Sequence, residues 1–329
     1  MFFINVPVGL AVLLLTVWKV PESSGAGERR RFDLAGGLLA VLGLGGVVFA
    51  LINSRPAFGL AGAVLFAGLL YLETRSSSPM LPLSLFHSRS FSGANLLTLF
   101  LYSGLSGMLF FFPLDLIQVQ GYTPTQAGAA LLPFILLMFL LSRWSGGLLD
   151  RYGARAPLVI GPLIVATGFA LFTRPGIVGS YWTMFFPALV VLGIGMAISV
   201  APLTTTVMNS VDQNHAGTAS GINNAISRVA ALLAVAAFGA LLADTFQGAL
   251  DRNLNHLGVS SAVAAHVEAQ SSRLAAAETD DPLARQAIDE AFVAGYRVVL
   301  WVSSGLAVAS SLTAALLITT KTESPREAQ

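Results

Sequence analysis

The sequence contains no cysteine, and only 11% of its 329 residues are charged. The absence of cysteine excludes disulfides, thiolate metal sites and cysteine nucleophiles. Soluble domains carry roughly 25% charged residues. The low charge, the 55% hydrophobic content and a mean hydropathy of +0.74 therefore exclude an ordinary soluble enzyme. The net charge of +1, with Lys and Arg dispersed at the ends of apolar segments, argues against a nucleic-acid partner.

Most of the sequence consists of long apolar segments. A helix of about 20 apolar residues crosses the roughly 30 Å hydrocarbon core of a bilayer, and unpaired backbone polar groups are not tolerated in lipid. The sequence therefore predicts an all-α, polytopic membrane helical bundle with about nine transmembrane helices. The expected spans are 4–19, 34–53, 58–73, 92–117, 124–142, 157–173, 181–200, 218–243 and 295–319.

Basic residues occupy alternate connections between these spans, which sets the expected orientation. The connections on one side contain Lys19, Arg29, Arg30, Arg31, Arg75, Arg89, Arg143, Arg151, Arg155, Lys321 and Arg326. The short connections on the other side contain only Arg55 and Arg174. The richer side is expected to be cytoplasmic, which places the C-terminus in the cytoplasm of a protein of the plasma (inner) membrane. The long, acidic connection at 244–293 then lies outside, either as a disordered loop or as a small cap.

The connection between the fifth and sixth spans has a distinctive pattern, GGLLDRYGARAPL at 146–158. Its polar and turn residues are Gly147, Asp150, Arg151, Gly153 and Arg155. Glycine permits a tight turn, and the carboxylate at a helix junction can bond to exposed helix-end amides or to a neighbouring Arg. The segment is therefore either a latch that breaks when helices separate, or an ordinary positive cytoplasmic loop with a glycine turn.

This segment resembles the loop pattern G-x-L-a-D-r-x-G-r-r of the major facilitator superfamily. Further segments resemble, in order, the fourteen-span drug:proton antiporter branch of that family. They are MFFINVPVGL at 1–10, RRRFDLAGG at 29–37, PMLPLSLFHSRSFSGAN at 79–95, GYTPTQAGAALLP at 121–133 and AGTASGINNAISR at 216–228. The resemblance covers essentially the whole chain and implies the major facilitator fold.

The resemblance also implies a domain organisation in which the chain begins near family span six. Residues 1–20 would be the last helix of an N-terminal bundle, and 21–78 a cytoplasmic loop with two central extra helices. Residues 79–329 would form the C-terminal six-helix bundle. The rest of the N-terminal bundle is expected to be missing, through a miscalled start or a truncated gene.

The implied activity is export of small amphipathic compounds or drugs in exchange for protons. The expected partners are a small-molecule substrate, protons, the lipid bilayer and the missing N-terminal half. Without that half, the chain is not expected to complete a transport cycle. A non-transporting membrane subunit that pairs with a separately encoded N-terminal half is the alternative.

Asp115 is the acid that most requires an explanation. It lies toward the outer end of the fourth span, within FFPLDLIQVQ, where the resembled family commonly has an aromatic residue. An ionised group at mid-membrane costs roughly 2.5–3.5 kcal/mol. Asp115 is therefore predicted either to bind a proton or a cationic substrate, or to face water at the outer mouth.

Four further polar residues and one arginine within spans are candidates for the same site. Ser220, Asn224 and Arg228 recur every four residues and share one helix face, which is expected to point into the bundle. They would line a substrate cavity or join helices by hydrogen bonds. Asn95 and Gln118 lie near opposite ends of the fourth span and are weaker candidates.

Enzyme chemistry has little support in the sequence. Ser106 lies in a G-x-S-G pattern, but all four histidines fall in predicted loops, so the serine has no base within the membrane. The histidines are His87, His215, His256 and His266. An intramembrane enzyme is thus the remote alternative, and no catalytic residue, cofactor or metal site is predicted.

Overall fold

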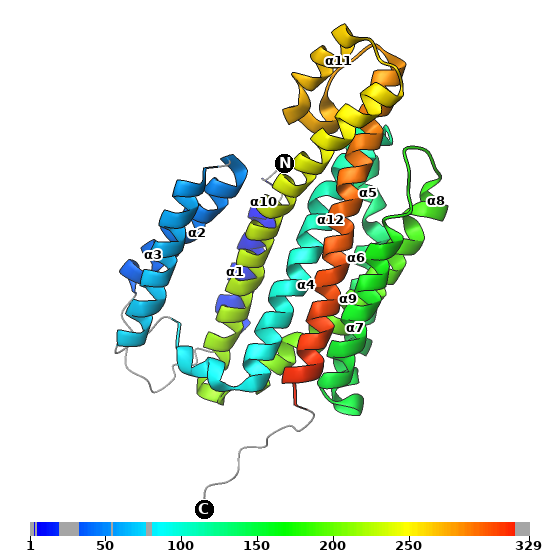
Figure 1. Cartoon of the computed structure of the whole chain (residues 1–329). Helices are drawn as coiled ribbons and strands as arrows, with labels where there is room; N and C mark the ends of the chain where they lie inside the picture. Colours follow the sequence, from blue (N-terminus) through cyan, green and yellow to red (C-terminus); the bar gives the residue numbers. More distant parts are fainter. Residues whose placement is uncertain (1–2, 4, 20–32, 54, 77–80, 320–329) are drawn as a thin grey trace, which may run out of the picture. The chain divides into compact units, whose positions relative to one another are not determined.

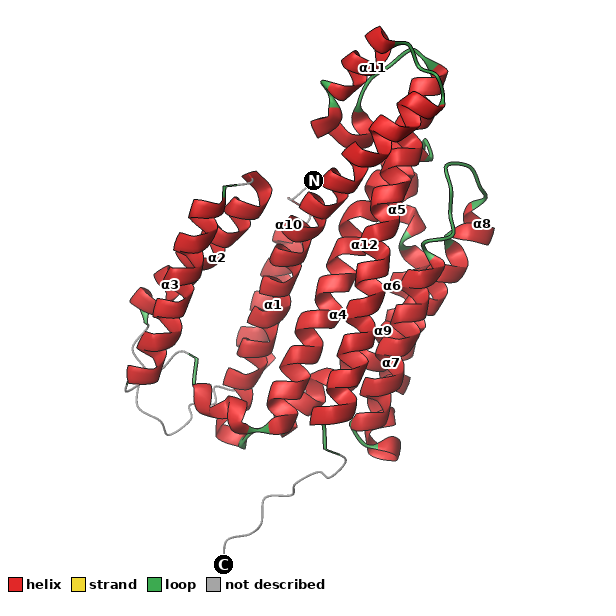
Figure 2. Cartoon of the chain, viewed as in Figure 1, coloured by secondary structure: helices red, strands yellow, loops and turns green. Residues whose placement is uncertain are grey.

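The computed structural model describes residues 3, 5–19, 33–53, 55–76 and 81–319. Within these ranges the chain forms helices joined by loops and turns, without strands (Figure 2). It divides into two compact units, Met1–Asp33 and Leu34–Gln329. The first unit contains one long described helix, α1 (Asn5–Lys19), and the second contains all the elements discussed below.

The second unit is built from helices of very different length. The long helices are α2 (Leu34–Asn53), α3 (Pro56–Arg75), α4 (Arg89–Leu114), α6 (Leu132–Tyr152), α7 (Arg155–Leu171), α9 (Phe186–Asn209), α10 (Ala216–His256) and α12 (Pro282–Leu317). The short elements are η2 (Leu83–His87), the π-helical segment η3 (Asp115–Val119), α5 (Pro124–Ala130), α8 (Tyr181–Met184), η4 (Gln213–His215), α11 (Ser261–Glu268) and η5 (Ser271–Ala276).

Seven helical segments of the described chain are long and apolar enough to cross a membrane. They are Ala35–Asn53, Pro56–Arg75, Arg89–Val119, Pro124–Tyr152, Phe186–Asn209, Gln213–His256 and Pro282–Leu317. The two remaining expected spans correspond to shorter apolar helices, Asn5–Lys19 and Arg155–Leu171. The prediction of an all-α polytopic bundle is confirmed, with seven full-length candidate spans and two short helices.

Close helix packing in the second unit depends on small residues. α12 packs against α4, α7 and α10, and α7 packs against α9. At the α7–α9 contact, a Cβ built on Gly195 would lie 2.7 Å from the backbone nitrogen of Val165. In the α2–α3 hairpin, a Cβ on Gly62 would lie 2.5 Å from the Gly43 carbonyl oxygen. Helices in lipid associate through such van der Waals contact, since lipid provides no hydrophobic drive between them.

The helices of the second unit alternate in direction, as the predicted threading requires. The α6–α7 turn and the end of α12 lie at one end of the bundle, where the Arg155 guanidinium donates a hydrogen bond to the Ala315 carbonyl (Figure 1). The ends of α10 and α12 that flank α11 lie at the opposite end (Figure 1). We refer to this second end as the cap end.

The connection expected at 244–293 is mostly helical. α10 continues to His256 and α12 begins at Pro282, so only residues 257–281 separate them, and these contain α11 and η5. The helix extensions are packed, because Leu250, Leu254 and Ile288 are buried. Of the two alternatives for this connection, the structure shows a small cap, defined here as residues 257–281.

Candidate functional site

Asp115 lies at the cap end of α4, where the helix changes to the π-helical segment η3. Pro113, two residues earlier, cannot donate a backbone hydrogen bond and perturbs the helix locally. The Asp115 carbonyl then accepts a bond from the Gln120 amide, five residues on, at 3.1 Å. π-helical turns are frequently found at functional sites. Asp115 is only 3% exposed in this structure, which argues against the alternative of a carboxylate that faces water.

η3 packs against α12, which carries Asp289, Tyr296 and Arg297. No described residue donates a hydrogen bond to the Asp115 carboxyl. Tyr296, next to Arg297, is buried. The Tyr296 hydroxyl and the Nε of Arg297 are buried without a hydrogen-bond partner in the described chain. We call Asp115, Arg285, Asp289, Tyr296 and Arg297 the Asp115 cluster.

Arg285 connects this cluster to the cap. Its Nη2 donates to the Gln118 carbonyl at 3.0 Å and to the Ala275 carbonyl at 2.9 Å, and its Nη1 donates to the Ala277 carbonyl at 3.2 Å. Arg285 also forms an ion pair with Asp289, one helical turn later. One guanidinium therefore joins η3, η5 and α12. Gln118 is part of this junction through its backbone carbonyl.

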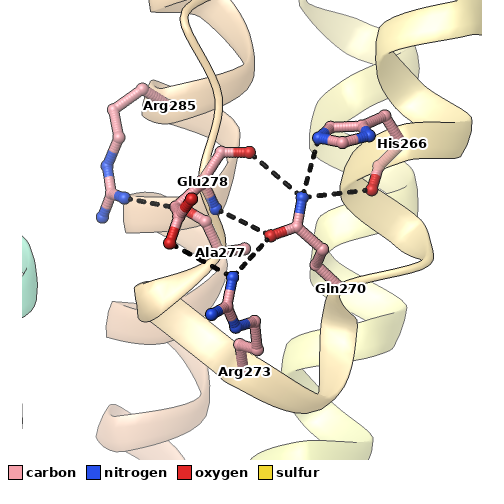
Figure 3. A network of polar contacts seen from close by, with 6 residues as sticks. All are labelled: His266, Gln270, Arg273, Ala277, Glu278 and Arg285. Carbon is pink, nitrogen blue, oxygen red and sulfur yellow. Dashed lines mark hydrogen bonds and ion pairs between the residues drawn. The ribbon is translucent and has the colours of Figure 1, made fainter.

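The cap is organised around Gln270 (Figure 3). The Gln270 amide group bonds to His266, to the backbone of Glu278 and to Arg273, and Arg273 forms an exposed ion pair with Glu278 at 3.2 Å. These bonds close the loop between α11 and α12 and hold the carbonyls that Arg285 reaches. In the described part of the chain, no group of three or more His, Asp or Glu side chains is placed to hold a metal ion.

Asn95 belongs to a separate polar contact between α4 and α10. The side-chain amide of Asn223 donates to the Asn95 oxygen at 3.1 Å and to the Thr98 hydroxyl at 2.7 Å. Asn95 and Thr98 are buried. The sequence interpretation selected Asn224 instead of Asn223, because spacing along a helix fixes which residues share a face but not where that face points.

The polar stripe on α10 does not face the interior of the described bundle. Asn224 and Arg228 are exposed, and Ser220 is half-buried. Within the described chain, the α10 residue that bonds to α4 is Asn223. The role of Ser220, Asn224 and Arg228 in lining a cavity stays a prediction.

Replacing Asn223 by Ala tests which face of α10 carries the structural contact. The change removes both bonds and leaves the Asn95 and Thr98 side chains without this partner, so we expect a loss of about 0.6–1.7 kcal/mol of stability. Asn224→Ala, one residue along the same helix, is expected to change stability by less than about 0.5 kcal/mol. Thermal unfolding of the purified protein in detergent measures both. Equal effects of the two variants would contradict the assignment.

The predicted cytoplasmic loop contains a glycine-dependent turn. α6 ends at Tyr152, and Gly153 follows with φ 70° and ψ 177°, a combination that residues with a Cβ rarely adopt. Its amide donates to the Leu149 carbonyl at 2.9 Å. Asp150 is exposed and forms no ion pair with a described residue, and Arg155 bonds to α12. The glycine turn is thus present, and the latch role of Asp150 and Arg151 stays a prediction.

Gly153→Ala is expected to destabilise the α6–α7 turn by about 1–3 kcal/mol, because it forces a Cβ into this backbone conformation. Gly147→Ala, in the preceding helix with nothing within 4 Å of the added Cβ, is the matched control. Because alanine favours helix more than glycine does, the control is expected to be neutral or slightly stabilising. Melting temperatures in detergent compare the two, and a Gly153→Ala protein as stable as the control would rule out strain at this turn.

Comparison with known proteins identifies the family of this chain. Residues 31–235 match the family model described as Major Facilitator Superfamily. The chain belongs to this family. Figure 2 and the candidate spans agree with the helical membrane architecture that membership requires.

Several named major facilitator proteins are similar to this chain. The multidrug resistance protein Stp of Mycobacterium tuberculosis is 33% identical over 279 residues, which cover 82% of this chain and 51% of Stp. The tetracenomycin C resistance and export protein of Streptomyces glaucescens is 32% identical over 256 residues, covering 74% of this chain and 46% of that protein. The chain thus spans about half the length of the curated relatives it matches.

A solved major facilitator structure has a similar fold. The crystal structure of a bacterial homolog to the human lysosomal transporter Spinster, inward-facing and unoccupied, superposes with a TM-score of 0.53 at 18% identity. The match covers 85% of this chain and 64% of that one. At this identity the likeness concerns the fold alone.

Proposed function

We propose that this chain is part of an exporter of small amphipathic compounds, driven by exchange for protons. The observation that carries the proposal is its similarity to resistance and export proteins over most of its own length. The Asp115 cluster supports the coupling to protons, because buried ionisable groups within membrane spans commonly belong to proton pathways. A family position in the fourteen-span drug:proton antiporter branch is consistent with the helical hairpin α2–α3 that precedes the six-helix portion.

The orientation that we propose places the α6–α7 turn and the C-terminus in the cytoplasm. Arg151, in the last turn of α6, and Arg155, at the start of α7, flank the α6–α7 turn at the end of the bundle where α12 finishes. The acidic cap lies at the opposite end (Figure 1). The positive-inside rule assigns the basic end to the cytoplasm. The cap then faces the outside of the plasma membrane, and the Asp115 cluster lies beneath it.

The mechanism that we propose is alternating access between two helical bundles. The six long helices from α4 to α12 would form one bundle. The second bundle would correspond to the part of each relative that this chain does not match. The exposed face of α10 with Ser220, Asn224 and Arg228 would then border the substrate cavity between bundles. Asp150 and Arg151 would bond to the second bundle in one of the two states.

The alternative is that this chain is a membrane subunit that pairs with a separately made N-terminal half. The similarity to resistance and export proteins favours it over any enzyme function. The two forms of the proposal share one fold and differ only in whether the second bundle is on the same polypeptide.

Dye transport into everted membrane vesicles tests the proposal. Vesicles containing this chain together with an N-terminal six-helix bundle, linked or co-expressed, should accumulate a fluorescent lipophilic cation when respiration acidifies the vesicle interior. A protonophore should abolish the accumulation, and the chain alone should give none. Accumulation that survives the protonophore would refute proton coupling, and its absence from every combination would refute the exporter assignment.

A further inference from the structure

The side-chain amide of Gln270 is held in one orientation by its neighbours in the cap (Figure 3). Its Oε1 accepts from the Glu278 amide at 3.1 Å and from the Arg273 guanidinium at 3.1 Å. Its Nε2 donates to the Glu278 carbonyl at 3.2 Å. Exchanging the oxygen and the nitrogen would set donor against donor or acceptor against acceptor in all three bonds. The nitrogen of Gln270 is therefore the atom that faces His266.

This orientation decides where the imidazole of His266 can carry its proton. The Gln270 Nε2 lies 2.9 Å from the His266 Nε2. Because an amide nitrogen only donates, the ring nitrogen that faces it must accept and must carry no proton. The neutral ring then has its single proton on Nδ1. An imidazolium has a proton on both nitrogens and cannot make this bond.

The charged groups around His266 include several acids. Glu278, Asp280 and Asp281 line the same surface cavity as His266, and Arg273, from η5, pairs with Glu278. The other charged residues of α11 and of the helix ends that pack against it are Glu268, Asp251, Arg252, His256, Arg285, Asp289 and Glu290. An imidazolium formed here would face carboxylates across the cavity while it loses the bond to Gln270.

The backbone inside this loop is strained. Leu274 has φ 55° and ψ −132°, and it is the one non-glycine residue with a positive φ in the described part of the chain. Such conformations persist only where the surrounding structure enforces them. The bonds between Gln270 and Glu278 enclose Leu274 and supply that restraint. Weakening the network at Gln270 therefore shifts the loop toward an open form.

The same loop holds the cap against the bundle. The carbonyls of Ala275 and Ala277 accept from Arg285, whose guanidinium also donates to the Gln118 carbonyl in η3. Hydrogen bonds and the loop backbone thus connect His266 to the end of α4. A change of charge at this exposed histidine can reach the segment that begins with Asp115.

We propose that His266 is a pH sensor of the cap, whose neutral imidazole keeps the loop between α11 and α12 closed through Gln270. Protonation of Nε2 by the aqueous phase breaks that hydrogen bond, opens the loop and loosens the hold of Arg285 on η3. Histidine ordinarily changes charge between about pH 5 and 8. The closed loop excludes the proton and the open loop accepts it, so the closed form is favoured at high pH and is lost as the pH falls. In the orientation proposed above, the sensed pH is that outside the cell.

Hydrogen exchange of the full chain in lipid nanodiscs, corrected for the intrinsic pH dependence of amide exchange, tests the proposal at about pH 8 and about pH 5. The cap amides of the wild type should lose protection about 3-fold to 10-fold at the lower pH, as expected for one hydrogen bond. His266→Gln has an oxygen acceptor that does not titrate in this range and should keep the cap protected at both values. His266→Ala has no acceptor and should give the weaker protection at both. His256→Gln, at an exposed histidine of α10, is the control and should retain the wild-type pH dependence.

The tautomer of His266 provides a second measurement, made on the wild-type chain. The chain has four histidines, and nitrogen-15 labelling of them should show one neutral ring that is protonated on Nδ1 at high pH and whose signal is missing from His266→Gln. A neutral His266 protonated on Nε2 would overturn the proposal. So would an acid-induced loss of cap protection that persists in His266→Gln, since it would belong to the carboxyls of the cavity. Equal protection of His266→Ala and the wild type at high pH would overturn it as well. None of these measurements needs transport, so a failed export assay would reject the proposed function alone.

Discussion

Replacing Asp115 by Asn is expected to reduce proton-driven export at least about 10-fold, while the protein still folds and binds substrate. A ligand shifts a conformational equilibrium only through its different affinity for the two states, and an amide cannot take up the proton that would supply this difference. Coupling free energies of about 1–3 kcal/mol correspond to changes of about 5-fold to 150-fold. The comparison is made in everted vesicles with the two-bundle protein, by following dye accumulation as a function of pH.

The shape of the pH profile is the more telling part of this experiment. Wild-type export should depend on pH, and the residual activity of Asp115→Asn should not, because the group that titrates is gone. Asp115→Glu keeps the carboxyl and should retain pH dependence at a reduced rate. Asp251→Asn, at an exposed acid of α10, is the control. An Asp115→Asn protein with the wild-type profile would remove this residue from the coupling mechanism.

The sequence was sufficient to predict the helical architecture. Apolar length is a direct consequence of the thickness of the bilayer, so the spans could be located without knowledge of packing. The turn at Gly153 was also predictable, because glycine in a short connection signals an unusual backbone conformation. Both features depend on neighbouring residues in the chain, and local sequence contains that information.

The extent of α10 and α12 beyond the membrane could not be predicted in the same way. Hydropathy detects the part of a helix that faces lipid, and residues 244–256 and 282–293 are too polar for that test. Their helices are stabilised instead by contacts with each other, through buried residues such as Phe246, Leu250 and Ile288. Such contacts join positions about 40 residues apart, so a search for apolar segments along the sequence does not detect them.

The Asp115 cluster was predicted only in part, for a related reason. Asp115 was identifiable because a lone acid in an apolar segment is costly. Asp289 and Arg285 were read as ordinary charges of an outer loop, since an acidic segment contains many such residues. What distinguishes them is their position against η3, more than 160 residues away in sequence. Similarly, Asn223 and Asn224 differ by one residue, and only the packing of α10 on α4 decides which of them bonds to α4.

Arg285→Ala, on α12, is expected to destabilise the protein more than the loss of any exposed charge in the cap, to which the Arg285 guanidinium bonds. The guanidinium is 35% exposed and Asp289 is 15% exposed. Removing one partner of a fully buried pair costs about 3–5 kcal/mol, and partial exposure reduces this, so we expect a loss of about 2–3 kcal/mol. Three carbonyls lose a donor at the same time, two of them in the cap. Amides of the cap should therefore exchange hydrogen at least about 10-fold faster, as a local opening of this size implies.

Arg273→Ala is the matched control, because this arginine belongs to the cap that Arg285 bonds to and also has an acidic partner. Its pair with Glu278 is 53% and 80% exposed (Figure 3), and exposed pairs contribute about 0–1 kcal/mol. Arg285→Lys separates the two functions of Arg285: it keeps a positive charge beside Asp289 but lacks the planar fork that reaches several carbonyls. If the ion pair alone mattered, Lys would restore the wild-type exchange rates. The four bonds of Arg285 indicate instead that the guanidinium holds the cap against η3. Lys should then keep Asp289 paired with a positive charge and the bundle stable, while the cap amides still exchange hydrogen faster than in the wild type.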